Sequence, residues 1–107
     1  MGIDVNADTF EKEVVQSETP VLVDFWGPQC KPCLALMPQV EKLAEEYEGK
    51  LKVTKVDASQ NRRLCISLRV LGLPTFLFYK NGEEVNRLSG GNLTSEEIGE
   101  AARKITE

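Results

Sequence analysis

Residues 21–33 read VLVDFWGPQCKPC, and this stretch contains the decisive feature of the chain, two cysteines separated by two residues. The apolar run at 21–26, which a single acid interrupts, is typical of a strand buried on both faces. Behind the cysteines, apolar residues recur at helical spacing: Leu36, Met37, Val40, Leu43, Ala44 and Tyr47. Gly49 ends this pattern. Cys30 and Cys33 are therefore predicted at the junction between a buried strand and a long helix.

The segments on either side of this junction predict further elements. Before the buried strand, the residues at 8–11 resemble a capping box and predict a helix over roughly 8–16. Apolar and polar residues alternate at 51–56, which predicts a strand, and residues 59–70 carry Leu64 and Leu68 at helical spacing. The charged side of the long helix consists of Glu41, Lys42, Glu45 and Glu46. Helices and strands therefore alternate here, as in a partly parallel sheet.

The last third of the chain has a different pattern. Residues 75–79 predict a strand, Asn81-Gly82 predicts a hairpin turn, and residues 83–88 return antiparallel. The capping box at 94–97 begins a final helix. Its apolar side consists of Ile98, Ala101, Ala102 and Ile105. The 107 residues contain no linker or repeat, so we expect one α/β domain over 1–107, with a central mixed β-sheet flanked by helices on both faces.

The composition excludes several classes of function. A net charge of −4 and a pI near 4.9 argue against nucleic acid or an anionic membrane as a partner. No apolar run approaches the roughly 20 residues of a membrane span, and the first residues lack the basic and apolar regions of a signal peptide. We therefore expect a cytoplasmic protein. Histidine is absent, which excludes His-based nucleophile pairs, triads and metal ligands.

The cysteine pair allows three interpretations: a metal clip, a structural disulfide or a redox centre. Three cysteines without histidine cannot supply the four ligands of a structural zinc site, and structural disulfides are rare in the cytosol. At a helix start, free N–H groups, the helix dipole and Lys31 favour a thiolate at Cys30, and Pro32 suits the first turn. Cys33 lies one turn further on, within reach of Cys30. The residues therefore favour thiol–disulfide exchange.

The order and spacing of VLVDFW, the CxxC motif and LGLPTFLFYKNGE resemble the thioredoxin family across essentially the whole chain. This resemblance implies a thioredoxin fold and a protein-disulfide reductase and electron carrier, with a redox-active Cys30–Cys33 disulfide and no cofactor. It further implies a monomer whose partners are target proteins with disulfides and a thioredoxin reductase-type electron donor. Two alternatives remain: a thiol oxidant or disulfide isomerase on the same fold, and a non-catalytic binding module.

Two charged residues are candidate catalytic groups besides the cysteines. Asp24 lies inside an apolar strand, where burial raises the pKa of a carboxyl group toward neutrality. The resemblance implies that Asp24 exchanges protons with Cys33. The resemblance also places Lys55 close to this acid, where an ion pair would lower the acid's pKa. An ammonium that reaches solvent instead is an equally good interpretation of Lys55.

The resemblance also implies a substrate-binding surface around the cysteines. Pro74 is expected at the start of its strand, because a central strand tolerates proline only at its first position. It matches the family's cis-proline, which presents its backbone to a bound substrate chain. Trp26 is interpreted first as packing beneath the site, and Gly90 as a groove glycine for which Gly91 is a rival. The expected surface consists of Trp26, Gln29, Lys31, Pro32, Leu73, Pro74, Thr75 and Gly90. Cys65 is interpreted as a buried packing residue.

Two residues depart from the usual pattern of the family. Gln29 stands where thioredoxins usually carry tryptophan, and Lys31 where they usually carry glycine. The loss of an aromatic contact surface at Gln29 predicts a different choice of partners. The added charge of Lys31 predicts a lower pKa of Cys30 and a more oxidising couple.

Overall fold

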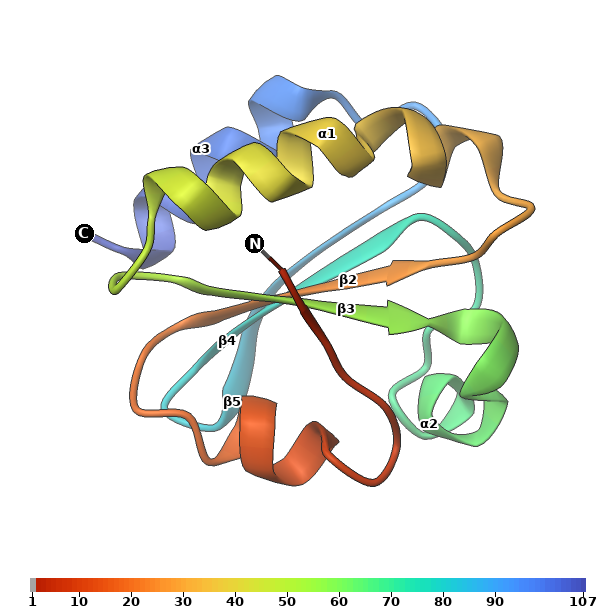
Figure 1. Ribbon diagram of the computed structural model, residues 1–107, viewed down its shortest axis with the longest axis horizontal. Helices are drawn as coiled ribbons and strands as arrows, with labels where there is room; N and C mark the ends of the chain where they lie inside the picture. Colours follow the sequence, from red (N-terminus) through yellow and green to blue (C-terminus); the bar gives the residue numbers. More distant parts are fainter. Residues whose placement is uncertain (1) are drawn as a thin grey trace.

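The computed structural model describes residues 2–107. A five-stranded sheet forms its centre, and helices lie on both sides of the sheet (Figure 1). In chain order the elements are β1 (Ile3–Asp4), η1 (Glu11–Val15), β2 (Val21–Trp26), α1 (Lys31–Glu46), β3 (Lys52–Asp57), η2 (Ala58–Gln60), α2 (Arg62–Ser67), β4 (Thr75–Lys80), β5 (Glu83–Ser89) and α3 (Ser95–Ile105). In residues 2–107 no helix is both long and apolar enough to cross a lipid bilayer.

The sheet is mixed, as the sequence predicts. Its strand order is β1-β3-β2-β4-β5, with β1, β3 and β2 parallel and with β4 and β5 antiparallel to their neighbours. The parallel pair β2 and β3 is connected through α1, because parallel neighbours need a long crossover. The hairpin between β4 and β5 turns at Asn81 and Gly82, whose φ angles of 55° and 81° are those that the Asn-Gly pair favours.

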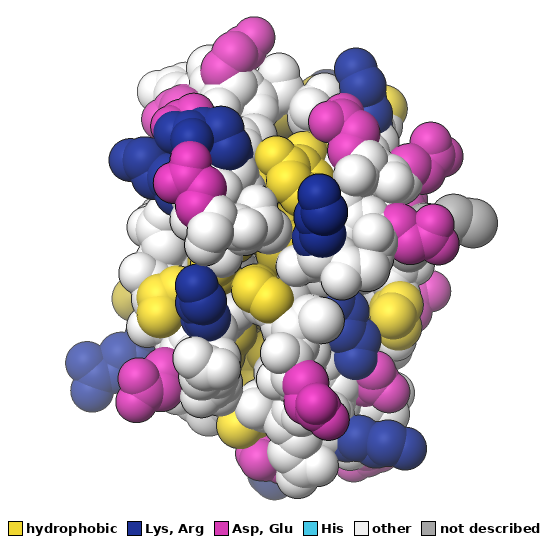
Figure 2. Space-filling model, turned by 90° about the vertical axis from the view of Figure 1, so that its left-hand side faces the viewer, with side chains coloured by type: hydrophobic (Ala, Val, Ile, Leu, Met, Phe, Trp, Pro, Cys, Tyr) yellow, Lys and Arg dark blue, Asp and Glu magenta, His cyan; other side chains and the backbone are white. Residues whose placement is uncertain are grey.

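Two apolar clusters cover the two faces of the sheet. On one face Leu22, Val53 and Phe76 pack against α1 and α3, and the capping box that begins α3 forms as predicted at Thr94 and Glu97. On the other face Val23, Phe25 and Leu77 pack against η1 and the α2 segment. Side chains alternate between faces along a strand, so residues 22, 24 and 26 of β2 point toward α1. At the end of the molecule away from α2, acidic and basic side chains are interspersed over the surface (Figure 2).

The structure differs from the sequence-based predictions at β1, at α2 and at the start of the first helix. Strand β1 was not predicted, because its two residues are too few to form a pattern. The helix expected at 59–70 is only α2, preceded by the short 3₁₀ turn η2. This helix ends before Arg69, which has a φ of 58°, and the N–H of Val70 turns back to the carbonyl of Cys65 at 2.8 Å.

The first helix also begins differently from the prediction. Asn6 rather than Asp8 organises its start, because the Asn6 side-chain oxygen accepts hydrogen bonds from the N–H groups of Asp8 and Thr9 at 2.8 and 3.0 Å. The turn that follows is η1, a π-helix in which Gln16 N–H donates to the carbonyl of Glu11. Val14 of η1 is buried against the sheet.

Candidate active site

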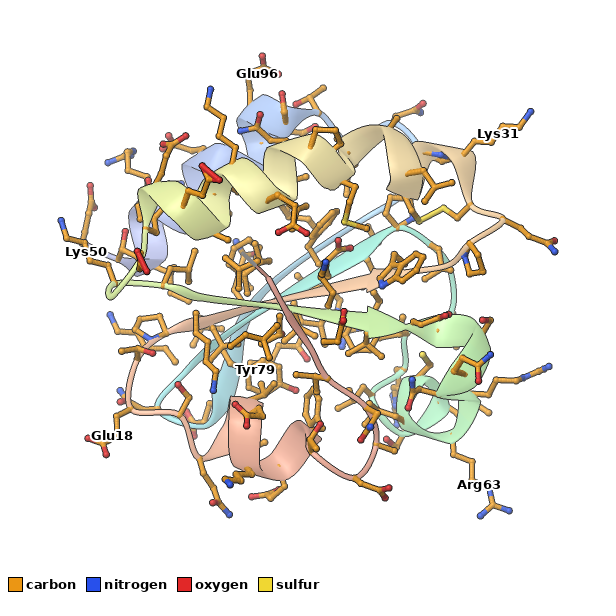
Figure 3. All side chains as sticks on the ribbon, viewed as in Figure 1. Glu18, Lys31, Lys50, Arg63, Tyr79 and Glu96 are labelled. Atoms are coloured by element: carbon orange, nitrogen blue, oxygen red, sulfur yellow. A yellow bond between two sulfur atoms is a disulfide. The ribbon has the colours of Figure 1, made fainter. Side chains whose placement is uncertain are left out.

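Cys30 and Cys33 form a disulfide at the start of α1 (Figure 3). Cys30 is the N-cap of the helix, and its sulfur accepts a hydrogen bond from the N–H of Cys33 at 3.2 Å. Lys31 and Pro32 occupy the first helical turn, where proline is tolerated because its missing N–H has no partner there. Cys30 is half-buried, whereas Cys33 is only 1% exposed. Cys30 is therefore the sulfur that an incoming group reaches first, and the adjacent N–H favours its thiolate.

Asp24 is buried on the α1 side of the sheet, with 1% of its surface exposed. Neither of its carboxyl oxygens has a hydrogen-bond partner among residues 2–107. Loss of hydration raises the pKa of Asp24 to about 7, although the charge of Lys55 lowers it and that of Glu41 raises it further. The predicted rise of this pKa is confirmed, and Asp24 can hold or release a proton near neutral pH.

Lys55 lies directly beside Asp24 in the register of β2 and β3, but its ion pair is with another acid. The Lys55 Nζ donates to Glu41 Oε2 at 2.7 Å, and Glu41 Oε1 accepts the N–H of Gly2 at 2.8 Å. These hydrogen bonds hold the pKa of Glu41 below its ordinary value. Lys55 therefore reaches Glu41, not Asp24, and acts on Asp24 only through its charge.

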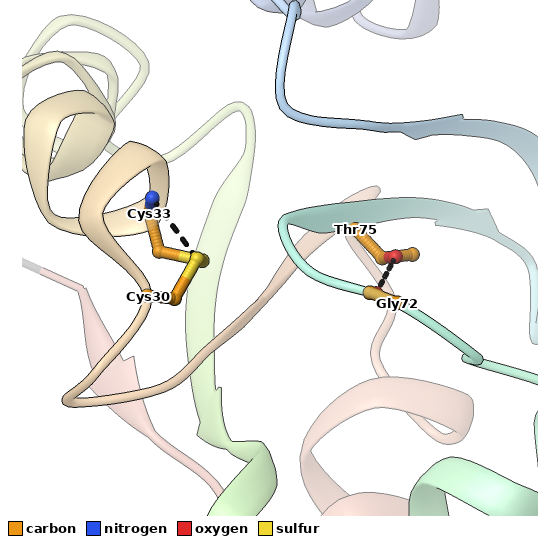
Figure 4. Close-up of a disulfide and its surroundings, with 4 residues drawn as sticks. All are labelled: Cys30, Cys33, Gly72 and Thr75. Carbon is orange, nitrogen blue, oxygen red and sulfur yellow. Dashed lines mark hydrogen bonds between the residues drawn. A yellow bond between two sulfur atoms is a disulfide. The ribbon is translucent and has the colours of Figure 1, made fainter.

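The loop before β4 lies opposite the disulfide (Figure 4). The Leu73–Pro74 peptide bond is cis, as the resemblance implied. Thr75 is buried and its hydroxyl donates to the carbonyl of Gly72 at 2.6 Å. Gly90, with a φ of 115°, donates its N–H to the carbonyl of Pro74 at 3.1 Å. The structure thus brings Gly90 next to Pro74, while Gly91 lies near Pro32.

A hollow of about 610 Å³ opens beside Cys30. Its lining consists of Gly27, Pro28, Gln29, Cys30, Ala58, Ser59, Arg62 and Leu73. Gln29 and Lys31 are exposed on the two sides of Cys30. Trp26 is half-buried, and its indole N–H is buried without a partner among residues 2–107, which fits the predicted packing role beneath the site.

The third cysteine lies outside this site. Cys65 in α2 is a free, buried thiol in the cluster on the opposite face of the sheet, as predicted, and burial raises its pKa. A thiol with a raised pKa is a poor nucleophile. Residues 2–107 contain no group of three or more Cys, Asp or Glu side chains arranged to hold a metal ion.

The sequence gives no indication of two residues of the site, one beside Lys55 and one in the hollow at Cys30. Glu41 was assigned to the charged outer side of α1, and only its distance to Lys55 reveals that it faces the sheet. Arg62 lines the hollow beside Cys30, although nothing in the local pattern of α2 distinguishes it from a solvated charge. Neither residue carried a signal in the sequence, because both depend on how the helices are placed against the sheet.

Comparison with known proteins identifies the same family that the motifs resemble. The thioredoxin family model matches residues 2–104. The thioredoxin of Peptoclostridium acidaminophilum is 45% identical over 96 residues, which are 90% of this chain and 87% of that protein. The thioredoxin of Acetoanaerobium sticklandii is 40% identical over 101 residues, 94% of this chain and 96% of that protein. Thioredoxin 1 of a Nostoc species is 41% identical over 86 residues, 80% of each chain.

These matches agree with the geometry of the chain. The mixed sheet with helices on both faces is the thioredoxin fold, and the disulfide at the start of α1 supports thiol–disulfide exchange. The chain belongs to the thioredoxin family.

Proposed function

We propose that the protein is a protein-disulfide reductase and electron carrier that acts through Cys30 and Cys33. The observation that carries this proposal is the position of the disulfide. Its first cysteine, Cys30, is half-buried and caps the start of α1. Its second cysteine, Cys33, is buried on the side of the sheet where Asp24 lies. A structural disulfide needs neither the exposed first sulfur nor a proton-exchanging group behind the second one.

Exchange proceeds in two steps from the dithiol form. The Cys30 thiolate attacks one sulfur of a target disulfide, which forms a mixed disulfide and releases the other target sulfur as a thiolate that takes up a proton. Cys33 then loses its proton and attacks Cys30, which expels the second target thiolate. The target gains two electrons and two protons, and the protein is left with the Cys30–Cys33 disulfide.

Asp24 is proposed as the base that takes the proton of Cys33 in the second step. Its carboxylate fraction is substantial at neutral pH because its pKa lies at about 7. Burial is the main cause of that value, and the charges of Lys55 and Glu41 adjust it in opposite directions. Since no hydrogen bond within residues 2–107 occupies the oxygens of Asp24, both are available to accept a proton.

The partners follow from the chemistry of the cycle. Trp26, Gln29, Lys31, Pro32, Leu73, Pro74, Thr75 and Gly90 are proposed to contact the target chain. A separate reductase of the thioredoxin reductase type returns the disulfide to the dithiol, and the protein acts as a monomer without a bound cofactor. The cytoplasm is the compartment proposed for this cycle, because disulfides are transient there.

Reduction of insulin by dithiothreitol tests the proposal. We expect the wild-type protein to accelerate the reaction at catalytic concentrations and the Cys30→Ser variant to have no effect, because it lacks the attacking sulfur. Circular dichroism of the variant serves as the control for folding. Failure of the folded wild-type protein to accelerate the reaction would falsify the reductase function.

Lys31 favours a second candidate, a thiol oxidant. Lys31 is exposed and follows Cys30 directly in the chain, and a positive charge that stabilises the thiolate of the reduced form makes a couple more oxidising. Redox titration of the wild type and of Lys31→Gly measures the effect of Lys31 on the reduction potential of the Cys30–Cys33 couple. We expect the wild type to be the more oxidising of the two, and equal potentials would remove the argument for the oxidant.

A further inference from the structure

One segment near the disulfide differs in charge from the rest of this acidic chain. Residues 58–75 contain Arg62, Arg63 and Arg69 and none of the chain's 17 Asp and Glu residues. All three arginines are exposed, and none forms an ion pair among residues 2–107. Lys31 and Arg63 extend from the same end of the molecule (Figure 3). The surface around the disulfide is therefore locally positive although the protein carries a net charge of −4.

Three adjoining hollows connect two of these arginines with Cys30. The first contains Cys30 and Arg62, the second contains Arg62, Ile66 and Leu71, and the third contains Arg69 and Leu71. Leu73, from the loop that faces the disulfide, lines all three. A polypeptide held at Cys30 can therefore continue along one trough past Arg62 and Arg69. We call this trough, lined by these two arginines with Ile66, Leu71 and Leu73, the arginine trough.

The arginine trough also has apolar side chains that nothing in residues 2–107 covers. Leu71 is 90% exposed and Ile66 is 68% exposed, the two highest values among the large hydrophobic residues of the described chain, 2–107. Isolated exposed leucines are common on protein surfaces. Here two such residues line one hollow that shares Arg62 and Leu73 with the hollow at Cys30, which favours a contact with a partner.

The turn at Arg69 is braced by hydrogen bonds, and the nearby acids lie outside the hollows. Arg87 pairs with Glu84 and donates to the carbonyls of Leu68 and Arg69 at 2.8 and 2.9 Å, which fixes the turn that presents the Arg69 side chain. Asp57 precedes the segment, but its carboxylate accepts the N–H and hydroxyl of Ser59. Neither of these acids lines any of the three hollows.

The opposite end of the molecule provides a contrast. There acidic and basic side chains are interspersed (Figure 2). The last turn of α3 carries two basic residues, Arg103 and Lys104. Arg103 pairs with Glu100 and Glu107. At the reactive end, the three arginines of residues 58–75 have no acidic residue in their own segment, so their charges can act on an approaching molecule.

We infer that the arginine trough selects target proteins whose disulfide is flanked by acidic residues together with an apolar side chain. The inference rests on the proposed reductase function and specifies its substrate class. Arg62 and Arg69 attract the carboxylates, and Ile66 and Leu71 contact the apolar side chain. Partly exposed ion pairs are individually weak, so two of them are expected to favour an acidic target by about three- to tenfold.

The test uses three synthetic peptides that share a disulfide-linked Cys-Ser-Leu-Cys core. The two residues on each side of the core are Glu-Glu, Ser-Ser or Lys-Lys. The pre-reduced protein is mixed with each peptide at low ionic strength, and the second-order rate constant of reduction is measured by chromatography. We expect the order Glu above Ser above Lys, with differences that shrink in 0.5 M salt because salt screens exposed charges.

Two double variants locate the effect. Arg62→Gln with Arg69→Gln removes two charges from the trough, and the ratio of the Glu to the Lys peptide should fall toward one. Arg103→Gln with Lys104→Gln removes the same charge from α3 and should keep the ratio of the wild type. Leu71→Ser should slow the reduction of all three peptides by a similar factor of about three, because it removes apolar contact area.

The outcomes distinguish a failure of the arginine trough from a failure of the reductase function. Equal rates for the three peptides, or equal loss of preference in both double variants, would overturn the arginine trough while leaving the reductase function intact. Unchanged rates in Leu71→Ser would overturn its apolar part. No reduction of any peptide by the wild type would overturn the reductase function and this inference together.

Discussion

The two faces of the sheet each bury a polar side chain, but only one of these side chains has a hydrogen-bond partner in the described part of the chain. On the η1 and α2 face, Thr54 is fully buried, and its hydroxyl donates to the carbonyl of Leu22 at 3.0 Å. On the α1 face, Asp24 of the neighbouring strand β2 is also almost completely buried. No group of residues 2–107 forms a hydrogen bond with its carboxyl oxygens. A satisfied hydroxyl costs little, whereas an unpartnered buried carboxyl lowers the stability of the fold.

This difference separates a structural face from a reactive one. Each face also holds one buried cysteine, Cys65 on the η1 and α2 face and Cys33 on the α1 face. Cys65 lies among apolar side chains, but Cys33 belongs to the face on which Asp24, Lys55 and Glu41 gather. Matched substitutions on the two faces should therefore differ in kind: one set changes only stability, and the other changes chemistry.

The two cysteines should show the largest contrast. Cys33→Ser is expected to abolish turnover in insulin reduction and to trap the target on Cys30 as a mixed disulfide, because no second sulfur remains to release it. Cys65→Ser is expected to keep the turnover rate and to lower the free energy of unfolding by about 1–2 kcal/mol, since it buries a hydroxyl in an apolar cluster. Turnover is followed by turbidity, and the mixed disulfide by non-reducing electrophoresis. A loss of turnover in Cys65→Ser would erase the distinction between the faces.

Asp24 should show the next largest effect, on stability as a function of pH. The folded protein keeps the Asp24 proton up to about pH 7, whereas the unfolded chain releases it near the ordinary value of 3.8. The unfolded state therefore binds fewer protons between these values, and the wild-type free energy of unfolding falls as pH rises. Over about three pH units the loss is about 4 kcal/mol.

Asp24→Asn removes this titration. The difference in unfolding free energy, variant minus wild type, should therefore grow by about 4 kcal/mol from pH 4 to pH 8. Denaturation by guanidinium chloride at both pH values measures it on the oxidised proteins, and the remaining acids cancel because both proteins share them. A difference that does not change with pH would mean that Asp24 is not protonated in the folded state.

Thr54→Val is the matched change on the structural face and should have a smaller effect. It replaces a hydroxyl by a methyl group of similar shape and removes the hydrogen bond to Leu22. We expect a loss of about 1 kcal/mol in the free energy of unfolding, equal at pH 4 and pH 8, with an unchanged rate of insulin reduction. The same denaturation series provides the measurement. A pH-dependent loss would show that the two faces are electrostatically coupled.

Much of this arrangement could be predicted from the sequence. The strand at 21–26, the helix behind it and the hairpin at Asn81-Gly82 follow from runs of apolar residues and a specific turn, and the structure confirms them. Strand β1 has too few residues for a pattern, and α2 is short because the chain turns at Arg69, which no local preference indicates. Local patterns predict long elements well, but short ones depend on tertiary contacts.

The site shows the same limit. The burial of Asp24 was predictable because apolar residues surround it in the chain. The partner of Lys55 was not, because Glu41 lies on the helix among residues that face solvent, and only the distance between α1 and β3 brings its carboxylate to Lys55. The arginine trough was equally hidden, because it combines α2 with the loop before β4. Features that depend on one helix or strand, such as the burial of Asp24, can be predicted from the sequence. Ion pairs and surfaces that combine several elements can be identified only in the structure.

Glu41 offers the finest test of the reactive face. Glu41→Gln removes a negative charge that raises the pKa of Asp24 and weakens the hold on the Lys55 ammonium, which lowers that pKa. Loss of the Glu41 charge lowers the pKa of Asp24, and a Lys55 ammonium that stays beside Asp24 keeps lowering it, so this pKa should fall below about 7. Titration of the Asp24 carboxyl by carbon-13 NMR measures the shift. Glutamine can still accept the N–H of Gly2, so the change is mainly one of charge.

Glu45→Gln is the matched control for this change. Glu45 lies four residues further along α1, is exposed, and has no ion pair with Lys55, so its substitution should leave the pKa of Asp24 where it is. An unchanged pKa of Asp24 in Glu41→Gln would mean that the charges of the Lys55–Glu41 ion pair have no net effect on Asp24. A raised pKa would mean that the freed Lys55 turns toward solvent, and that the ion pair with Glu41 is what keeps this ammonium beside the acid.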